Sequence, residues 1–427
     1  MLKTINVLIF PAGEMNSAEL CFALSRQVNI KLFGASSFER MGRHLFKNYR
    51  NDLPVISHER FLDSFTELLR EWAIDIVIPT HDSVVKFFSD HRDKFECRLL
   101  IPSARTARAC RDKEFAMNLF QGEDFVPQIY LSPDHLPKDV FVKPKEGQGA
   151  VGARKMSSQS PAIYDIDWHN ELVSEYLPGE EITVDCFTDG HQRLLGVFPR
   201  SRDRLLGGIC VAGVSMQATD EINQIARRIN DELDFLGMWF FQLKRASNNR
   251  WKLLEISARC SGTQCLTRAR GVNLPLLSVY AAMGREVSVT ENNIGLRMDR
   301  LLVPMFDFDY KYEAAYVDYD DTLVHTDGVD PEIIGLLYQW RRDGIRIVLI
   351  TRHAGDLREH MSRHSIVESL FDEIIHIDDE SLKSDHINPE NAVFVDNSHV
   401  ERQQVRLKFG IPVFDVEGAQ VLKRWTL

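Results

Sequence analysis

The sequence predicts a multidomain protein that combines α/β and α+β architecture. Its 427 residues are enough for about three domains of ordinary size. Apolar strand-like runs alternate with helical stretches at the start of the chain, which is typical of a parallel sheet with crossover helices. A β-hairpin pattern follows, and a second alternation begins near Ala314. We therefore expect an N-terminal parallel-sheet domain over residues 1–103, a mixed domain over 104–308 and a Rossmann-like domain over 311–427.

The composition is that of an ordinary globular protein, with 44% hydrophobic and 26% charged residues. A net charge of −11 and the lack of a basic block argue against nucleic-acid binding. The seven cysteines are dispersed without CxxC pairs, which favours reduced thiols over a disulfide framework or a zinc site. The first apolar run is short and is broken by Pro11, and no run approaches membrane-spanning length. We therefore expect a cytoplasmic protein that does not bind membranes.

The first domain begins with a strand over residues 4–10, followed by a helix that begins near Asn16. The spacing of Asn16 and Glu19 fits a capping box. Further strands are expected over 30–34 and 74–79, with helices over 59–71 and from residue 82. Gly13 and Glu14 follow the first strand, at the sheet edge where α/β domains bind ligands. A ligand contact and a purely structural turn are both consistent with this position.

A glycine-rich stretch follows a predicted helix over residues 104–120. Gly147, Gly149 and Gly152 have the spacing of a dinucleotide-binding fingerprint. That fingerprint needs a helix at its third glycine, whereas residues 153–156 predict a returning strand. We therefore predict a flexible loop that covers phosphate groups, because backbone N–H groups and the preceding Lys143 both suit phosphate oxygens. A plain mobile hairpin is the alternative.

Residues 172–187 predict a strand, a turn at Pro178-Gly179 and a second strand that opens at Glu180-Glu181. A nucleotide could lie across this break, with its adenine against exposed backbone and its ribose hydroxyls bonded to a carboxylate. An acidic hairpin tip is the alternative.

Residues 240–263 predict two strands joined by a turn at Ser247-Asn248-Asn249. Glu255, Ser257 and Arg259 alternate and should project from one face, which Gln242 of the partner strand could join. Such oxygen ligands suit Mg²⁺, which prefers one or two carboxylates together with the phosphates of a substrate. An arginine beside them would neutralise a phosphoryl group in transfer. A hairpin with a solvated polar face is the alternative.

Together these motifs resemble the ATP-grasp superfamily over residues 1–300, in particular its carbamoyl-phosphate-synthetase and biotin-carboxylase-like branch. The resemblance implies ATP and Mg²⁺ (or Mn²⁺) as cofactors. Ser257 departs from the family pattern, because many members carry asparagine two residues after the metal-binding glutamate. The hydroxyl oxygen of Ser257 can still ligate Mg²⁺ or hold a water on it, and the glycine loop, with Gly147 and Gly149, is expected to cover the phosphates. The roles that the resemblance implies are phosphate binding by Lys113 and Lys143, adenine binding by Glu175 and Leu177, ribose binding by Glu181, metal binding by Gln242 and Glu255, and catalysis by Arg259 at the transferred phosphoryl group.

The C-terminal domain has polar residues at the ends of its predicted strands. A strand from Ala314 leads into Asp318 and Asp320, and two aspartates at this spacing can serve as nucleophile and acid/base. Thr351 and Asp396 follow later strands, and Lys383 precedes a helix-to-strand turn. This series resembles the haloacid dehalogenase (HAD) superfamily of aspartate-nucleophile phosphatases over residues 314–427.

The HAD resemblance implies that Asp318 is the nucleophile and Asp320 the acid/base. It implies that Thr351 and Lys383 are catalytic contacts to the phosphate, and that Asp318, Asp320 and Asp396 bind Mg²⁺. Two positions depart from the family pattern. Asp321 replaces a small glycine, and Asn397 stands where a second acid is frequent, a charge that Glu401 could supply instead. The gaps between the motifs hold roughly one βαβ unit each, so we expect a capless domain with an open catalytic face.

We consider three functions. The first is a bifunctional enzyme that joins a carboxylate to an amine or another nucleophile through an acyl phosphate, with a Mg²⁺-dependent phosphatase acting on a phosphorylated substrate or product. The second pairs an ATP-grasp kinase with the phosphatase, and the third treats the front of the chain as a nucleotide sensor that regulates the phosphatase. The expected partners are small molecules, and a homodimer is left open. The sequence does not identify the acceptor. We expect its specificity to be set by the first domain and by loops such as residues 200–213.

Overall fold

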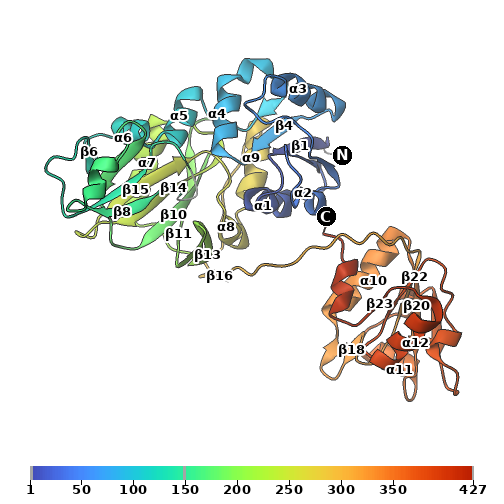
Figure 1. The fold of residues 1–427 in the computed structure, drawn as a ribbon. Coiled ribbons are helices and arrows are strands. Elements are labelled where there is room, and N and C mark those ends of the chain that lie inside the picture. Colours follow the sequence, from blue (N-terminus) through green and yellow to red (C-terminus); the bar gives the residue numbers. More distant parts are fainter. Residues whose placement is uncertain (1–2, 148–150, 426–427) are drawn as a thin grey trace. The chain divides into compact units, whose positions relative to one another are not determined.

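The computed structural model describes residues 3–147 and 151–425. The chain divides into two compact units, here called unit 1, which ends at Leu302, and unit 2, from Val303 to Trp425 (Figure 1). Within the described residues, no helix combines the length and the apolar character needed to cross a bilayer.

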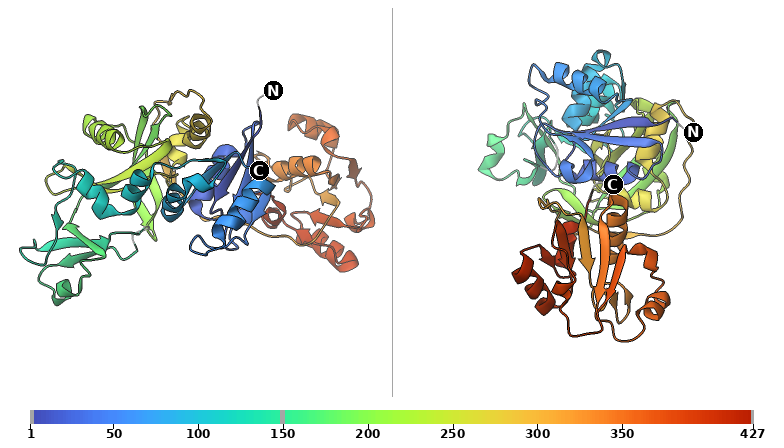
Figure 2. Two further views of the ribbon diagram at one scale, coloured as in Figure 1. Left: turned by 90° about the horizontal axis from the view of Figure 1, so that it is seen from above. Right: turned by 90° about the vertical axis from the view of Figure 1, so that its right-hand side faces the viewer.

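Unit 1 begins with a five-stranded parallel sheet, whose strands are drawn in blue in Figure 2. Its strand order is β3-β2-β1-β4-β5, and all neighbouring strands are parallel, which confirms the predicted parallel sheet. Phe10 of β1 packs against Phe61 and Phe65 of α3 and Phe88 of α4 in a buried aromatic cluster. The strand order reverses between β1 and β4, so the residues that follow these strands lie at a switch point, where open α/β sheets bind ligands. The elements are β1 (Ile5–Phe10), α1 (Met15–Leu24), β2 (Ile30–Ala35), α2 (Gly42–Leu45), β3 (Asn48–Arg50), α3 (Phe61–Glu71), β4 (Ile76–Pro79), α4 (Asp82–Asp90) and β5 (Arg98–Leu99).

The first helix differs in detail from the prediction. It begins at Met15, and the hydroxyl of Ser17 accepts hydrogen bonds from the backbone N–H groups of Gly13 (2.7 Å) and Glu14 (3.0 Å). The predicted cap of Asn16 with Glu19 is therefore wrong. Glu19 is buried instead and forms an ion pair with Arg268, so its position is decided by tertiary packing rather than by capping.

The middle of unit 1 contains two four-stranded antiparallel sheets, β6-β9-β7-β8 and β11-β10-β14-β15, and a three-stranded sheet, β12-β13-β16. Trp239 and Phe241 of β14 pack in one core with Ile222 and Ile225 of α7. The strands are β6 (Ile129–Tyr130), β7 (Asp139–Pro144), β8 (Arg154–Ser157), β9 (Glu171–Glu175), β10 (Glu181–Thr188), β11 (Leu194–Ser201), β12 (Arg204–Leu206), β13 (Ile209–Val214), β14 (Gly237–Arg245), β15 (Trp251–Ser257) and β16 (Arg297–Asp299). The helices are α5 (Ala104–Arg111), α6 (Lys113–Leu119), α7 (Asp220–Glu232), α8 (Cys265–Ala269) and α9 (Leu274–Ala282).

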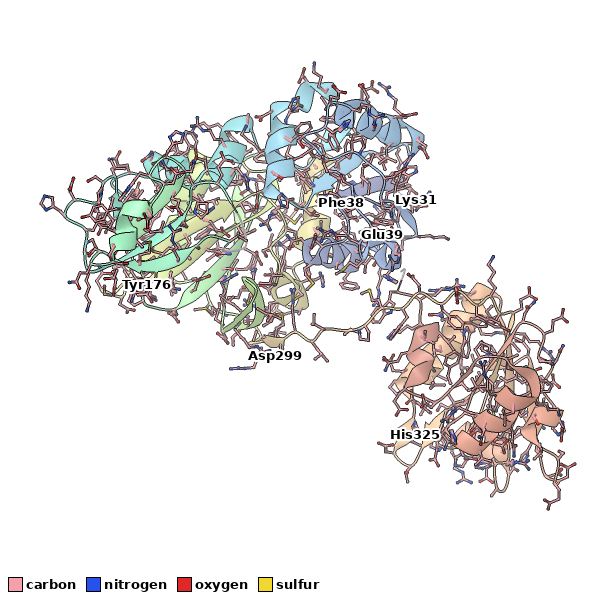
Figure 3. The ribbon with its side chains drawn as sticks, in the orientation of Figure 1. Lys31, Phe38, Glu39, Tyr176, Asp299 and His325 are labelled. Atoms are coloured by element: carbon pink, nitrogen blue, oxygen red, sulfur yellow. The ribbon has the colours of Figure 1, made fainter. Side chains whose placement is uncertain are left out.

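Two predictions in this region need correction. The single helix expected over 104–120 is divided into α5 and α6, because the Asp112 side chain accepts a hydrogen bond from Phe115 N (3.0 Å) and starts a new helix. Residues 200–213, expected to be loop, form most of the β12–β13 hairpin. Arg204 of β12 lies 3.3 Å from Asp299 of β16, which Figure 3 labels.

Unit 2 has its own five-stranded parallel sheet, in the order β21-β20-β17-β22-β23. Residues 303–313 belong to this unit. Phe308, Tyr310 and Tyr312 pack against its core, and Tyr312 Oη accepts a hydrogen bond from Trp340 Nε1 (2.8 Å). The elements are β17 (Ala314–Val317), β18 (Val324–His325), β19 (Gly328–Val329), α10 (Pro331–Asp343), β20 (Arg346–Thr351), α11 (Leu357–Arg363), β21 (Glu373–His376), β22 (Ala392–Val395), α12 (His399–Phe409) and β23 (Val413–Phe414).

Candidate active sites

Unit 1 contains a cleft of about 590 Å³. One wall comes from the segments after β1 and β4, including Asn16, Thr80 and His81. The opposite parts come from β7, the β12–β13 hairpin and the β14–β15 hairpin. The cleft therefore extends from the switch point of the parallel sheet to the polar face of the antiparallel hairpin. The predicted site residues that line it are Lys113, Lys143, Gly147, Glu181, Gln242, Glu255 and Arg259.

The β14–β15 hairpin brings together Gln242 and Glu255, which are predicted to bind Mg²⁺. Gln242 and Glu255 are direct partners in the antiparallel register. The pairing then shifts, so that Leu243 pairs with Leu253 and Leu254 becomes the extra residue of a bulge. Glu255 therefore lies beside Gln242, while the carbonyl of Leu254 is free of the ladder and accepts a hydrogen bond from Lys143 Nζ (2.9 Å).

Two lysines supply positive charge to this cleft. Lys143, on β7, is buried, and its burial together with the neighbouring Lys113 lowers its pKa to about 8. Burial also lowers the pKa of Lys113, whose ammonium donates to Gly147 O (3.0 Å). A pair of desolvated ammonium groups favours an anion between them, because a neighbouring negative charge stabilises both charged forms. The chemistry of these donors therefore fits nucleotide phosphates.

The glycine loop joins antiparallel strands. Val142 of β7 pairs with Arg154 of β8, so no helix opens at the third glycine and the rejection of a dinucleotide fingerprint is confirmed. Gly152 has φ +75°, and a Cβ there would lie 3.0 Å from Pro144 Cγ, so a larger residue would be strained. Gly149, a predicted phosphate contact, lies outside the described residues.

Comparisons with known proteins agree with this geometry. Residues 168–302 match the family described as "ATP-grasp in the biosynthetic pathway with Ter operon". This part of unit 1 is therefore similar in sequence to an ATP-grasp domain. No curated protein matches the whole sequence significantly.

Several solved structures resemble the chain in fold at low sequence identity. Biotin carboxylase from Campylobacter jejuni has a TM-score of 0.55 at 14% identity, with 68% of this chain and 74% of that chain covered. N5-carboxyaminoimidazole ribonucleotide synthetase from Thermotoga maritima has a TM-score of 0.54 at 12% identity, with 73% and 83% covered. Rhizobium etli pyruvate carboxylase has a TM-score of 0.54 at 13% identity, but the match covers 67% of this chain and only 29% of that one.

The predicted nucleoside-binding residues lie around the break between β9 and β10. Glu181 lines the cleft and is ion-paired with Arg202 (2.7 Å) and Lys244 (3.4 Å). Glu175 and Leu177 are not among the residues that line the described cleft. Glu175 Oε1 accepts a hydrogen bond from Gln128 N (3.0 Å), and Leu177 is buried. The neighbouring Tyr176 (Figure 3) has its ring 4.2 Å from Lys155 Nζ.

The sequence reasoning missed Asp82, which contacts two predicted site residues. Asp82 Oδ2 lies 3.0 Å from Arg259 Nε and 2.9 Å from Arg259 Nη2. Ser257, predicted as a metal ligand, donates its hydroxyl hydrogen to Asp82 Oδ1 (2.6 Å). The available signal was the position of Asp82 just after a parallel strand, at the sheet edge that binds ligands.

A second buried network contributes Arg200, Ser261 and Thr263 to the lining of the cleft. Arg200 and Asp185 form a fully buried ion pair. Arg200 also donates to Thr263 Oγ1 (2.6 Å) and Ser261 Oγ (2.7 Å), and Ser261 donates to Asp185 Oδ1 (2.6 Å). Because every charge here is paired and hydrogen-bonded, this network fixes the segment after β15 that carries Ser261 and Thr263 to the cleft.

Unit 2 brings four predicted residues to the carboxyl end of its parallel sheet. Asp318, Thr351 and Asp396 follow or end the adjacent strands β17, β20 and β22. Lys383 Nζ lies between the two acids, 2.6 Å from Asp318 Oδ1 and 2.7 Å from Asp396 Oδ2. Burial raises the pKa of Asp318 to about 6, although Lys383 opposes this rise. The buried ammonium therefore compensates two buried carboxylates.

Asp320 points to a different partner. His353 Nδ1 lies 2.8 Å from Asp320 Oδ1, so the predicted metal-binding acids are divided between Lys383 and this histidine. In residues 3–147 and 151–425, no group of three or more His, Cys, Asp or Glu side chains is arranged to hold a metal ion. Sequence reasoning missed His353, and its position two residues after Thr351 was the only local signal.

The two unusual positions of unit 2 have clear local structures. Asp321 adopts a left-handed conformation with φ +54°, which explains why a glycine is favoured there. Asn397 N donates to Thr322 Oγ1 (2.9 Å), and Glu401 forms an ion pair with Arg352 (3.4 Å). Between Asp318 and Thr351 the chain forms only the short β18–β19 hairpin, α10 and β20, with no separate cap domain.

Proposed function

We propose that unit 1 is an ATP-dependent ligase that converts a carboxylate to an acyl phosphate for attack by an amine or another nucleophile. The observation that carries this proposal is the direct pairing of Gln242 with Glu255 in a cleft that also contains Lys143 and Arg259. The resemblance to a carboxylase and a synthetase supports ligase chemistry rather than a kinase.

The residues of the cleft have different roles in this proposal, according to their charge. Lys113 and Lys143 bind phosphate oxygens. Gln242 and Glu255 would hold Mg²⁺, which would supply positive charge at the phosphates. The acceptor carboxylate attacks the γ-phosphorus and ADP leaves. Arg259 stabilises the charge on the phosphoryl group in transfer. The nucleophile then attacks the acyl carbon, loses its proton and releases phosphate.

The test is a screen of carboxylates crossed with amines, in which ADP release and product masses are measured. A ligase needs both co-substrates and yields a condensed product together with phosphate. ADP release with one co-substrate and a stable phosphoester would identify a kinase instead. ATP binding without turnover under every condition would favour the nucleotide-sensing role.

We also propose that unit 2 is a Mg²⁺-dependent phosphatase. The placement of Asp318, Lys383 and Asp396 at the carboxyl end of the sheet supports this assignment. Asp318 attacks the phosphorus to form an aspartyl phosphate, while Asp320 protonates the leaving oxygen and later activates water. Asp318 and Asp396, whose oxygens suit Mg²⁺, would hold the ion, which supplies positive charge at the phosphate. Phosphate release from a small phosphate ester, with and without Mg²⁺, tests the proposal.

A further inference from the structure

We infer that Asp82 is a positioning residue that fixes the Arg259 guanidinium for the transferred phosphoryl group, an inference that rests on the proposed ligase function. Asp82 is the first residue of α4, the helix that follows β4 of the parallel sheet, and it lies 177 residues before Arg259 in the sequence. The two residues before it, Thr80 and His81, line the cleft. The phosphoryl-binding cation is therefore held from the wall of the cleft that the parallel sheet supplies.

The hydrogen bonds of Arg259 leave a defined set of donors. Its Nε and one Nη2 hydrogen meet Asp82 Oδ2, and one Nη1 hydrogen meets Cys260 O (3.1 Å). A guanidinium has five N–H groups, so one remains on each terminal nitrogen. The Phe240 ring also lies 5.2 Å from Arg259 Cζ. Held in this way, the group can present two N–H donors to an oxyanion without first losing rotational freedom.

Ser257 is part of the same arrangement. Its hydroxyl donates to Asp82 Oδ1, so both carboxylate oxygens of Asp82 have partners. Ser257 is buried, and this bond directs its hydroxyl hydrogen to Asp82. Ser257, two positions after Glu255, therefore hydrogen-bonds to the carboxylate that holds Arg259, which accounts for serine at this position.

The electrostatics agree with a permanently ionised pair. Burial alone would raise the pKa of Asp82, but Arg259 and the Ser257 hydrogen bond together hold it below its usual range. Both side chains are largely buried, with 12% of the Arg259 side chain and 9% of the Asp82 side chain exposed. Loss of the carboxylate would leave the guanidinium mobile and its charge poorly compensated.

The experiment compares the affinities of wild-type protein and Asp82→Asn for ADP·Mg²⁺ and for ADP·Mg²⁺ with aluminium fluoride, which mimics the phosphoryl group in transfer. We expect Asp82→Asn to keep the ADP·Mg²⁺ affinity within about 2-fold and to weaken the aluminium fluoride complex by about 10-fold or more, because only the latter depends on a fixed Arg259. Asp82→Glu, which keeps the charge, should restore part of the loss. Asp63→Asn, a change in the first turn of α3, is the matched control.

Several outcomes separate the possibilities. If wild-type protein binds the aluminium fluoride complex more tightly than ADP·Mg²⁺ and Asp82→Asn does so equally, the inference is overturned. Failure of the wild-type protein to bind ADP·Mg²⁺ at all would instead contradict the proposed function. If Asp82→Asn does not fold, Ser257→Ala tests the same network, and an unchanged preference for the aluminium fluoride complex would then overturn the inference.

Discussion

Gln242 and Glu255 are direct cross-strand partners, and the register shift immediately after them exposes the Leu254 carbonyl to Lys143. One irregularity in a β-ladder thus sets the position of two predicted Mg²⁺ ligands and a buried ammonium. Bulges of this kind re-aim side chains next to active sites. Loss of either Lys143 or Glu255 should therefore affect nucleotide turnover without unfolding the hairpin.

We expect Lys143→Ala and Glu255→Gln each to lower ADP release by about 10²-fold or more, because each removes a preorganised charge from the reacting phosphates. Steady-state ADP formation measures this effect. Lys138→Ala, which removes an exposed lysine just before β7, serves as the control and should turn over at the wild-type rate. Near-normal ADP production by either cleft variant would remove the basis for the ATP site.

The pKa of Lys143 predicts a pH dependence of nucleotide binding. Burial and Lys113 lower it to about 8, so free protein loses this charge as the pH rises above that value. Phosphates favour the ammonium, so nucleotide binding should take up a proton at about pH 8.5 and weaken at higher pH. Calorimetry in two buffers with different ionisation enthalpies measures this uptake.

The lowered pKa of Lys143 also affects the stability of the fold, which should increase with pH where nucleotide binding weakens. Between the lowered pKa and the usual pKa of a lysine, the unfolded chain binds more protons than the folded chain, so the free energy of unfolding should rise with pH in that window. The variant Lys143→Arg is a control for the binding experiment. Arginine keeps its charge over this whole pH range, so the variant should take up no proton when nucleotide binds. Equal uptake in the variant would assign it to another group.

The hairpin and the parallel sheets could be predicted from the sequence because their signals are local. Polar turn residues lie between β14 and β15, and the alternation of side chains places Glu255 on the polar face. The contact of Asp82 with Arg259 could not be predicted, because it depends on how α4 packs against the segment after β15. The break at Asp112 was missed because a helical pattern on both sides conceals a capping aspartate.

In the site of unit 2, too, the local features could be predicted and the tertiary contacts could not. The aspartates and the threonine could be placed because strand ends meet at one edge of a parallel sheet. The ion pair between Asp320 and His353 could not, since it depends on the conformation of the chain after β20.

We expect Asp318→Asn to abolish hydrolysis of a small phosphate ester, because an amide cannot form the aspartyl phosphate. Asp320→Asn should be nearly as damaging, since it removes the proton donor. Neither change should alter ADP release by unit 1. Phosphate release by each variant measures the effect, and hydrolysis by Asp318→Asn at the wild-type rate would show that the nucleophile is another residue.

The left-handed conformation of Asp321 allows a test of its local strain. Its φ of +54° is unfavourable for residues with a Cβ, although aspartate tolerates it better than most. Asp321 N donates to Val324 O (2.8 Å), so the β18–β19 hairpin depends on this turn. Asp321→Gly should therefore be more stable than Asp321→Ala by about 1 kcal/mol, because only glycine adopts the conformation without a steric cost.

Hydrogen exchange of the β17 and β22 amides, measured in the full chain, reports the opening free energy of unit 2 separately from unit 1. The control compares Asp327→Ala with Asp327→Gly. Asp327 lies in the turn between β18 and β19 and has no positive φ, so alanine should equal or exceed glycine in stability there. If alanine and glycine were equally stable at residue 321, the left-handed conformation would carry no measurable cost. The preference for glycine at this position would then need a different explanation, such as access of the substrate to Asp320.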